Sequence, residues 1–340
     1  MCQCPSADRP SSPVSNTIYV TDSTDWLYTY REQFSQLDPP VEVVTVDDGT
    51  AVVGAASDAA DLIADPALLT DAVLAGLNGL KSLQFTTTEF HHLDLAALEK
   101  RGVVLGGVNQ ALAPGAAQHL IDLTAATARL IGHPGVKGVP TFPEFENKVV
   151  GIVGFGDTGM ELVHQLEGTR CEYRYMDVRT ARRDDFGASR VRRLTLDRVL
   201  VEADYVFILV PLTPQTRGLF DLREFRIMKP EAVLVNGSHP DVIVANDLLT
   251  ALNDGLFAGA AIAYRDDELE SHQRVAALSY PTTPPGHVAE RAIGTIAENL
   301  DAIRAGQPLP APVESIGVPL LGDPSFWSSR FTPRPARPRT

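Results

Sequence analysis

Short apolar runs rich in β-branched residues alternate with amphipathic stretches along the first third of the chain. Strands favour β-branched residues and helices need an apolar stripe, so the runs predict strands and the stretches between them predict helices. The predicted strands are residues 17–20, 41–46, 61–64, 80–85 and 103–105, and the predicted helices are 70–77 and 93–101. This alternation is typical of a parallel sheet with crossover helices.

A second series of the same kind begins at Lys148 and runs to about residue 287. Long amphipathic helices are predicted on either side of it, at residues 111–131 and 288–306. We therefore expect an α/β protein with two interleaved domains. The expected division gives 17–110 with 288–322 to a smaller domain, 111–287 to a second domain, and the Ser- and Pro-rich ends, 1–16 and 323–340, to a disordered leader and tail.

The sharpest motif is a glycine-rich turn, GFGDTG, that joins the predicted strand VVGIV to a helix. In this strand–turn–helix context the glycines are typical of a dinucleotide-binding site. Gly154 would permit the tight turn, Gly156 would let the backbone approach a pyrophosphate, and Gly159 would let the helix pack closely on the strand. The N–H groups at the helix start would attract the anion. The alternative is a plain strand–turn–helix with no ligand.

An acidic residue, Asp177, closes the next predicted strand, CEYRYMD. Its carboxylate would accept hydrogen bonds from the adenosine ribose and repel a 2′-phosphate, which favours NAD over NADP. Arg179, Arg182 and Arg183 follow closely and could tolerate that phosphate, so NADP stays open.

Charge and composition narrow the possible partners and the compartment. The chain has 29 Lys and Arg against 43 Asp and Glu, a net charge of −14, which argues against general affinity for nucleic acid or anionic membranes. No apolar run reaches the roughly 18 residues of a membrane span. Its 3 cysteines cannot make a disulfide framework, so we expect a cytoplasmic protein. The excess of arginine over lysine and the abundant alanine would suit a GC-rich bacterial genome.

Residues 80–305, roughly, resemble the D-isomer-specific 2-hydroxyacid dehydrogenases, the group that contains phosphoglycerate, formate and phosphite dehydrogenases. The likeness lies in EFENKVVGIVGFGDTG, ADYVFILVPLTPQTRGLF, FRIMKPEAVLVNGS and LLTALNDGLFAGAAI. The resemblance implies a Rossmann-type NAD-binding domain inserted into a smaller flavodoxin-like domain, and a homodimer that acts on a small-molecule substrate. Besides the three glycines and Asp177, it implies cofactor contacts at Asp157, Thr158, Arg179, Pro211, Thr216 and Asn236.

The catalytic pattern departs from this family. Such proteins use an Arg that anchors the substrate, a His that acts as acid and base, and a Glu that supports the His. The Arg should follow an Asn-x-Ser pattern, and there this chain has His239. Imidazole is neither permanently charged nor bidentate, so the change is large. The Asp that usually follows GAAI is replaced by Ala263.

The remaining two catalytic positions are less sharply aligned. The resemblance places the Glu at Glu268, with Asp266 and Asp267 as alternative acids. For the His, one register puts Pro285 at the position and a one-residue slip puts His287 there. We take His287 as the acid/base because an imidazole is well matched to protonating a carbonyl oxygen. The alternative is a histidine that caps or packs at a helix start.

The substrate loop of the smaller domain also differs, since Glu89 stands where the family has a glycine. An acidic side chain there should disfavour an anionic substrate. The predicted substrate contacts are Thr87, Thr88, Glu89 and His91. His91 and His92 would lie near the rim of the substrate cleft, and with His239 and His287 they suggest a metal site on composition alone. Adjacent histidines are more often plain surface residues, and we expect no metal.

Three functions fit these observations. The first, which we favour, is an NAD(P)-dependent oxidoreductase with an atypical active site, acting on a small hydroxy or oxo substrate that is not an ordinary 2-hydroxy acid. The second is a catalytically inactive NAD(H)-binding sensor or scaffold. The third is non-redox chemistry on the same fold, which the fold alone does not exclude.

Overall fold

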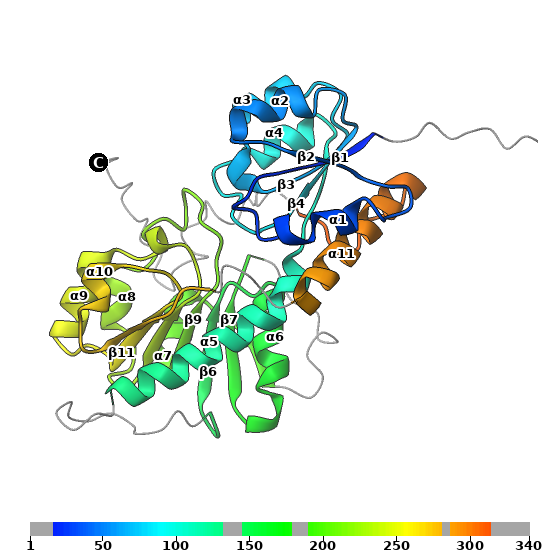
Figure 1. Ribbon diagram of the computed structural model, residues 1–340. Coiled ribbons are helices and arrows are strands. Elements are labelled where there is room, and N and C mark those ends of the chain that lie inside the picture. Colours follow the sequence, from blue (N-terminus) through cyan, green and yellow to red (C-terminus); the bar gives the residue numbers. More distant parts are fainter. Residues whose placement is uncertain (1–15, 132–144, 179–189, 281–285, 314–340) are drawn as a thin grey trace, which may run out of the picture. The chain divides into compact units, whose positions relative to one another are not determined.

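The computed structural model describes residues 16–131, 145–178, 190–280 and 286–313. The described residues divide into two compact units, one of residues 16–108 with 286–313 and one of 109–131, 145–178 and 190–280. Each unit is built on a parallel sheet with helices around it, which confirms the predicted α/β class (Figure 1). The predicted tail, the leader up to residue 15 and the segment around Pro285 lie outside the described residues.

The first unit is a five-stranded sheet in the order β2-β1-β3-β4-β5, as far as the described residues show. This order is that of the flavodoxin-like doubly wound fold. The strands are β1 (Thr17–Thr21), β2 (Glu42–Thr45), β3 (Asp61–Ala64), β4 (Ser82–Phe85) and β5 (Val104–Gly106). The helices are α1 (Arg31–Phe34), α2 (Val52–Ala55), α3 (Asp71–Gly76), α4 (Leu95–Lys100) and α11 (Gly286–Ala305), with 3₁₀ turns η1 (Tyr28–Tyr30), η2 (Gly49–Ala51) and η3 (Pro66–Leu68).

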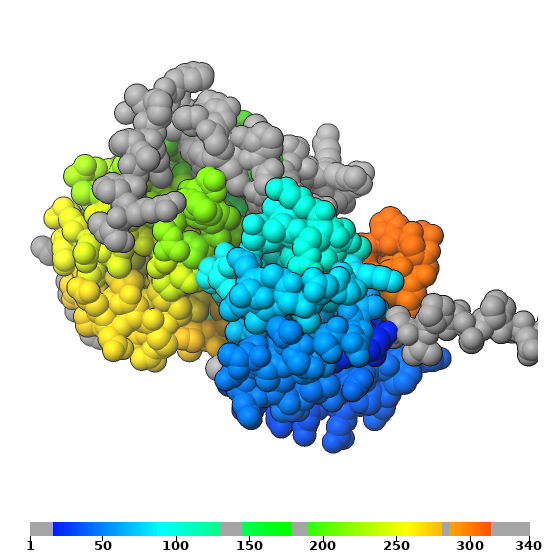
Figure 2. Space-filling view, turned by 90° about the horizontal axis from the view of Figure 1, so that it is seen from above, coloured from blue at the N-terminus to red at the C-terminus, as the bar shows by residue number. Residues whose placement is uncertain are grey.

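The interleaving of the chain is visible in this unit, because α11 comes from the far end of the sequence. In Figure 2 it is the orange segment, which belongs with the blue and cyan N-terminal residues in one unit. Asn299 of α11 ties the two parts together: its Nδ2 donates to Gln84 Oε1 of β4 at 2.9 Å, and its Oδ1 accepts the N–H of Ala311 at 3.1 Å. All three groups are buried, so these bonds replace lost hydration.

The second unit carries a seven-stranded parallel sheet in the order β12-β11-β10-β9-β6-β7-β8 within the described residues. The strands are β6 (Val149–Val153), β7 (Glu172–Met176), β8 (Arg190–Arg193), β9 (Tyr205–Ile208), β10 (Val233–Asn236), β11 (Gly259–Ile262) and β12 (Val275–Ala277). The helices are α5 (Asn109–Ile131), α6 (Asp157–Gln165), α7 (Leu196–Glu202), α8 (Leu222–Arg226), α9 (Ala245–Asn253) and α10 (Asp267–Glu270), with 3₁₀ turns η4 (Glu167–Thr169) and η6 (Pro240–Val242).

Two apolar clusters sandwich this sheet. One packs α5 and α6 against Ile152, Phe207 and Val235, and the other packs α7, α8 and α9 against residues of the opposite face such as Leu234 and Ile262. Successive side chains along a strand point to opposite faces of the sheet. A strand that is covered on both faces must therefore be apolar along its whole length. The buried runs of β6, β9, β10 and β11 follow from this. Figure 1 shows α5 lying across one face beside α6.

Two element boundaries differ from the prediction in an informative way. The helix expected at 93–101 is shorter, because the Asp94 carboxylate accepts the N–H of Ala97 and so caps the helix that begins at Leu95. The last helix begins at Gly286, two residues before the predicted start, and its first turn therefore includes His287.

Candidate functional site

The order of strands in the second unit marks a position where ligands bind. Strands β7 and β8 lie on one side of β6, and the chain then crosses to β9, β10 and β11 on the other side. In open parallel sheets, ligands bind outside the carboxyl ends of the strands where the order reverses in this way. Here that position is the pair of neighbouring strands β6 and β9. The glycine-rich turn begins immediately after β6.

The glycines of the turn occupy three different environments. Gly154 has φ +96°, and a Cβ there would lie 2.7 Å from the backbone of Leu209, so only glycine fits without strain. A Cβ on Gly159 would approach the Gly154 carbonyl oxygen at 3.1 Å, which shows how closely α6 packs on the turn. A Cβ on Gly156 would meet nothing within 4 Å. The turn is therefore packed on one side and open beside Gly156.

This arrangement fits a dinucleotide pyrophosphate. Gly156 is the N-cap of α6 and has no side chain that could cap the helix, so the N–H groups of Asp157 and Thr158 begin a helix without a side-chain cap. A helix N-terminus carries partial positive charge and attracts phosphate. The open space at Gly156 adjoins it. The contacts predicted for Gly154, Gly156, Asp157, Thr158 and Gly159 are compatible with this geometry.

Asp177 lies directly after β7 and is tied to the turn. Its Oδ2 accepts the backbone N–H of Phe155 at 2.5 Å. Arg193, at the end of β8, donates to the Asp177 carbonyl oxygen at 2.8 Å. The carboxylate predicted to meet a ribose is thus held by the turn, and the main chain of the same residue is held by a guanidinium. The predicted contact Arg179 lies outside the described residues.

The loop after β9 contains Pro211 and Thr216, which were both predicted to contact the cofactor. Pro211 is exposed, whereas Thr216 is buried. The Thr216 hydroxyl donates to the Pro211 carbonyl oxygen and accepts the N–H of Thr213, both at 2.7 Å. Its hydroxyl therefore shapes the loop, and a direct contact of Thr216 with a ligand stays a prediction.

Asn236 ends β10 and is fully buried. Its Oδ1 accepts the N–H of Ser238 at 2.9 Å, and its Nδ2 donates to the hydroxyl of Tyr264 at 3.3 Å. Tyr264 lies two residues beyond β11, whose Ile262 pairs with Asn236 in the sheet. The side-chain amide thus bridges the carboxyl ends of two neighbouring strands. The Ser238 hydroxyl is buried beside it with no hydrogen-bond partner within the described residues.

His239 lies at the same edge and has a defined orientation. Its Nδ1 accepts the backbone N–H of Asp241 at 3.1 Å, so the imidazole caps the 3₁₀ turn η6. A nitrogen that accepts a hydrogen bond carries no proton, so the proton of the neutral ring is on Nε2. Asp241 itself forms an ion pair with Arg217. The ring therefore has one neutral N–H, on Nε2, where the resemblance leads one to expect a guanidinium.

The predicted partner acid, Glu268, is exposed in the first turn of α10. Asp266 caps that helix by accepting the N–H groups of Glu268 and Leu269 at 3.1 and 3.0 Å. Of the two alternative acids, Asp266 therefore has a structural task. Since His287 belongs to the first unit and Glu268 to the second, the pairing of these two side chains stays a prediction.

The predicted substrate loop follows β4 in the first unit. Thr88 and Glu89 are exposed, and Thr87 is half-buried. The Glu89 carboxylate lies 3.7 Å from Nδ1 of His91, so these two predicted contacts face each other. His92 is different, because its Nε2 lies 3.1 Å from the carbonyl oxygens of both Pro66 and Leu69.

His92 thus holds the backbone after β3, and its ring nitrogen is occupied. Within the described residues, no group of three or more His, Cys, Asp or Glu side chains is arranged to hold a metal ion. The same residues include no helix that is both long and apolar enough to cross a bilayer.

Buried acids beneath this loop were not singled out from the sequence. Asp25 is 3% exposed and accepts hydrogen bonds from the Tyr19 hydroxyl at 2.8 Å, the Leu27 N–H at 2.9 Å and the Thr86 hydroxyl at 3.3 Å. Burial raises the pKa of Asp25 to about 6. Burial also raises the pKa of Asp65, with Asp22 and Glu89 adding repulsion. The carboxyl edge of the first sheet is therefore acidic.

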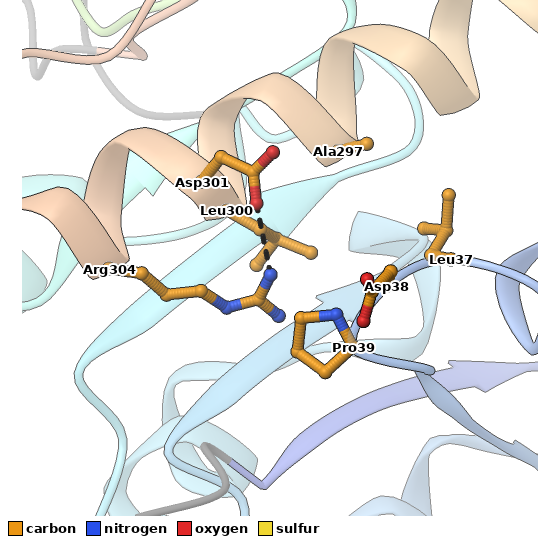
Figure 3. Close-up of a pocket in the computed structure, with 7 residues that line it drawn as sticks. All are labelled: Leu37, Asp38, Pro39, Ala297, Leu300, Asp301 and Arg304. Atoms are coloured by element: carbon orange, nitrogen blue, oxygen red, sulfur yellow. Dashed lines mark hydrogen bonds and ion pairs between the residues drawn. The ribbon is translucent and has the colours of Figure 1, made fainter. Parts of the chain in front are cut away.

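A shallow groove in the first unit lies between the loop that precedes β2 and the last turns of α11 (Figure 3). Its volume is about 170 Å³. Small-molecule sites usually enclose about 300–1,000 Å³. The guanidinium of Arg304 on its wall is paired with Asp301 at 3.1 Å. The groove therefore adds nothing to the candidate site, which lies at the carboxyl edges of the strands.

Residues 125–284 match the sequence profile of the NAD-binding domain of the D-isomer-specific 2-hydroxyacid dehydrogenases. This segment belongs to the family's NAD-binding domain. The matched segment contains the glycine-rich turn, the loop after β9 and the ends of β10 and β11, so the second unit is the family's NAD(P)-binding domain. The resemblance to this family that the sequence motifs indicated is confirmed.

Curated relatives support the same membership. A glyoxylate reductase of Thermococcus litoralis is 28% identical over 277 residues, which cover 71% of this chain and 80% of that protein. A glyoxylate reductase of Pyrococcus furiosus is 27% identical over 239 residues, covering 64% of this chain and 71% of the relative.

Solved structures extend the likeness to the whole fold. A glyoxylate reductase from Paecilomyes thermophila has a TM-score of 0.73 at 17% identity, covering 88% of this chain and 98% of that one. An acyclic imino acid reductase in complex with NADPH and D-Arg also has a TM-score of 0.73, at 18% identity, covering 87% of this chain and 100% of that one. The predicted arrangement, a Rossmann-type domain inserted into a flavodoxin-like domain, is confirmed.

Proposed function

We propose that this member of the 2-hydroxyacid dehydrogenase family is an NAD(P)-dependent oxidoreductase that acts on a small carbonyl or hydroxy compound without requiring a carboxylate next to the reacting carbon. The observation that carries the proposal is the orientation of His239. Its Nδ1 accepts the Asp241 N–H, so the neutral ring carries its single N–H on Nε2. A neutral donor can polarise a carbonyl oxygen, but it cannot form the paired, charged hydrogen bonds with which arginine holds a carboxylate.

Each of the predicted site residues has a separate role in this proposal. A nicotinamide dinucleotide held at the glycine-rich turn would donate a hydride to the substrate carbonyl carbon or, in the reverse direction, accept one from the hydroxyl-bearing carbon. The open side of the turn at Gly156 and the start of α6 would hold its pyrophosphate, and Asp177 would meet its adenosine ribose. His239 would donate to the reacting oxygen through Nε2. His287, supported by Glu268, would carry the proton.

The acidic edge of the first unit supports the same choice of substrate. Glu89 is exposed in the predicted substrate loop, and Asp65 and Asp22 lie close enough for mutual repulsion. Negative charges of this kind repel a carboxylate and leave a neutral aldehyde or ketone unaffected. We therefore propose neutral oxo compounds ahead of 2-oxo acids.

The preferred cofactor is, in this proposal, NAD. The Asp177 carboxylate would repel a 2′-phosphate, and its hydrogen bond to Phe155 N–H fixes it beside the turn. Among the described residues, Arg193 is placed to reduce that repulsion, because its guanidinium is held at the Asp177 carbonyl oxygen. The affinities for NADH and NADPH, measured by calorimetry, test the preference directly. We further propose a cytoplasmic homodimer, on the cysteine content and the family resemblance.

The test of the function compares 2-oxo acids with the matching aldehydes under saturating NADH. We expect turnover of the aldehydes at the higher kcat/KM. His239→Asn should lower kcat/KM about 100-fold or more, as loss of a donor to a developing oxyanion does. Asparagine can still accept the Asp241 N–H and cap η6, so this variant separates catalysis from folding.

The matched control is His272→Asn. His272 accepts the N–H of Arg274 through Nδ1 at 3.2 Å, in the same local geometry as His239, but it precedes β12 and so lies at the opposite edge of the sheet. This variant should keep full activity. If NADH binds and no substrate of either class is reduced, the oxidoreductase proposal fails and the inactive NAD(H)-binding function takes its place.

A further inference from the structure

Tyr264 was not predicted as a functional residue, yet it lies at the ligand-binding edge of the second unit. It follows β11 by two residues, and its half-buried ring packs against the apolar cluster that contains Leu234 and Ile262. Its hydroxyl reaches Asn236 at the end of β10. The group is therefore fixed both by packing and by a hydrogen bond, at the carboxyl ends of two neighbouring strands.

The hydrogen bonds around Asn236 determine which way the Tyr264 hydroxyl proton can point. The Ser238 N–H is a donor, so the Asn236 atom that it meets at 2.9 Å must be the oxygen. The amide nitrogen then faces Tyr264, and at 3.3 Å it must donate to the hydroxyl oxygen. A rotated amide would place two donors against each other at Ser238. The Tyr264 proton is consequently directed to some other acceptor.

In the described part of the chain, no protein acceptor lies within hydrogen-bond distance of that proton. The hydroxyl is protonated at neutral pH, as tyrosine ordinarily is, and burial, with the carboxylates of Asp266 and Asp241 adding to it, raises the pKa of Tyr264 further, to about 12. A half-buried donor that is held in place and lacks an acceptor is what a ligand-binding site requires.

The position in the sheet indicates which part of a ligand would supply the acceptor. The glycine-rich turn follows β6, and Asp177 follows β7 on the adenosine side. A dinucleotide that binds where the strand order reverses, between β6 and β9, extends its nicotinamide half toward β9, β10 and β11. Tyr264 follows β11, on that second side. The nearby carboxylates of Asp266 and Asp241 would repel an anionic acceptor, so a neutral carbonyl oxygen is favoured.

We propose that the Tyr264 hydroxyl, oriented by Asn236, donates a hydrogen bond to the carboxamide oxygen of the nicotinamide ring and so positions that ring at the end of β11. This inference rests on the proposed function in requiring a nicotinamide dinucleotide at the site. It makes Tyr264 a cofactor-binding residue and Asn236 a positioning residue.

The test is calorimetric titration of the full-length protein and of Tyr264→Phe with three ligands: NADH, its thionicotinamide analogue and ADP-ribose. Phenylalanine keeps the ring packing and removes only the donor. We expect NADH to bind Tyr264→Phe about 5- to 10-fold more weakly, the loss typical of one neutral hydrogen bond. The thionicotinamide analogue should lose less, because sulfur is a weak acceptor. ADP-ribose lacks the nicotinamide and should bind both proteins equally.

Asn236→Asp provides a second variant with a different physical basis. A carboxylate would accept the Tyr264 proton and withdraw it from the ligand, so this variant should also weaken NADH binding. In the double variant Tyr264→Phe, Asn236→Asp the two losses should not add, because both remove the same hydrogen bond.

Four results would overturn the assignment. The first is NADH affinity of Tyr264→Phe equal to that of the unmodified protein. The second is an equal loss for NADH and ADP-ribose, which would indicate a general structural effect. The third is unchanged NADH affinity with lowered kcat/KM, which would assign the hydroxyl to the substrate. The fourth is failure of the unmodified protein to bind NADH, which would refute the proposed function together with this inference.

Discussion

The carboxyl edges of the two parallel sheets carry opposite chemistry. In the second unit, the edge at β6 presents glycines and the start of α6, whose N-cap residue Gly156 provides no side-chain cap, a combination that attracts anions. In the first unit, the ends of β1, β3 and β4 present Asp22, Asp25, Asp65 and Glu89. Both sheets are doubly wound, so both have their loops at the equivalent place. Topology therefore sets where a ligand can bind, and the side chains in those loops set which ligand is accepted.

The acids of the first unit have structural tasks as well. Asp22 accepts the N–H groups of Thr24 and Asp25 at 2.7 and 3.0 Å, and Asp65 accepts the N–H of Ala67 at 2.8 Å. Each carboxylate therefore shapes the turn that follows its strand. Glu89 has no such backbone contact among those described, and it is the most exposed of the set. Selection of a neutral substrate would then come mainly from carboxylates that the loops already need for folding. Glu89 would add a negative charge that has no such structural task.

The largest effect should come from placing an acid at the anion-attracting edge. Gly156→Glu has room for its side chain, since a Cβ there meets nothing within 4 Å. The new charge would lie beside the proposed pyrophosphate position, and two like charges 4 Å apart near a protein surface repel by about 4 kcal/mol. We expect NADH affinity, measured by calorimetry, to fall at least about 100-fold at an unchanged melting temperature.

Gly154→Ala is the companion variant, and its main effect should be on stability. Its φ of +96° costs an alanine about 1–2 kcal/mol, and the 2.7 Å approach to the Leu209 backbone adds to this. The melting temperature should therefore fall. If Gly156→Glu unfolds the protein, or binds NADH normally, the two edges do not differ as described.

The glycine-rich turn could be predicted from the sequence because its chemistry lies in the backbone. Gly154 and Gly159 are required by close approaches within one short segment, and their spacing is therefore visible in the sequence. Tyr264 could not be found in the same way. Its partner Asn236 is 28 positions away, and only the pairing of β10 with β11 brings the two together. Asp25 is similar, because its contact with Thr86 joins the end of β4 to the loop after β1.

A second test uses Asp25 to measure how much the acidic edge lowers the free energy of unfolding at neutral pH. Its pKa is raised by burial to about 6, against an ordinary 3.8, so the folded state binds a proton more tightly than the unfolded state. The stabilisation by that proton is complete below pH 4 and is lost as the pH rises through 6. A difference of about two pH units corresponds to about 3 kcal/mol. The first unit should therefore be less stable at pH 7 than at pH 4 by up to this amount.

Asp25→Asn should remove this part of the pH dependence. Urea unfolding at pH 4 and pH 7 can be followed by the fluorescence of Trp26, whose indole N–H donates to the Thr86 carbonyl oxygen at 2.8 Å, in a Trp327→Phe background. Asp47→Asn, at an exposed aspartate of the same unit, is the control and should keep the dependence of the unmodified protein. An Asp25→Asn variant that still loses about 3 kcal/mol between pH 4 and pH 7 would assign the effect to other groups.

The smallest expected effect concerns substrate choice at the acidic edge. The Glu89 side chain is 69% exposed, and its partner His91 lies 3.7 Å away, so solvent weakens its influence. Glu89→Gln should therefore raise kcat/KM for 2-oxo acids only about 2- to 3-fold and leave that for the matching aldehydes unchanged. The gain should vanish near 1 M salt, where the screening length is about 3 Å. Glu42→Gln, at an exposed glutamate that begins β2 and so lies at the opposite edge of the same sheet, should change neither. An equal gain for both substrate classes would show that Glu89 acts through the shape of the loop, and the difference in charge between the two edges would then have no part in selecting the substrate.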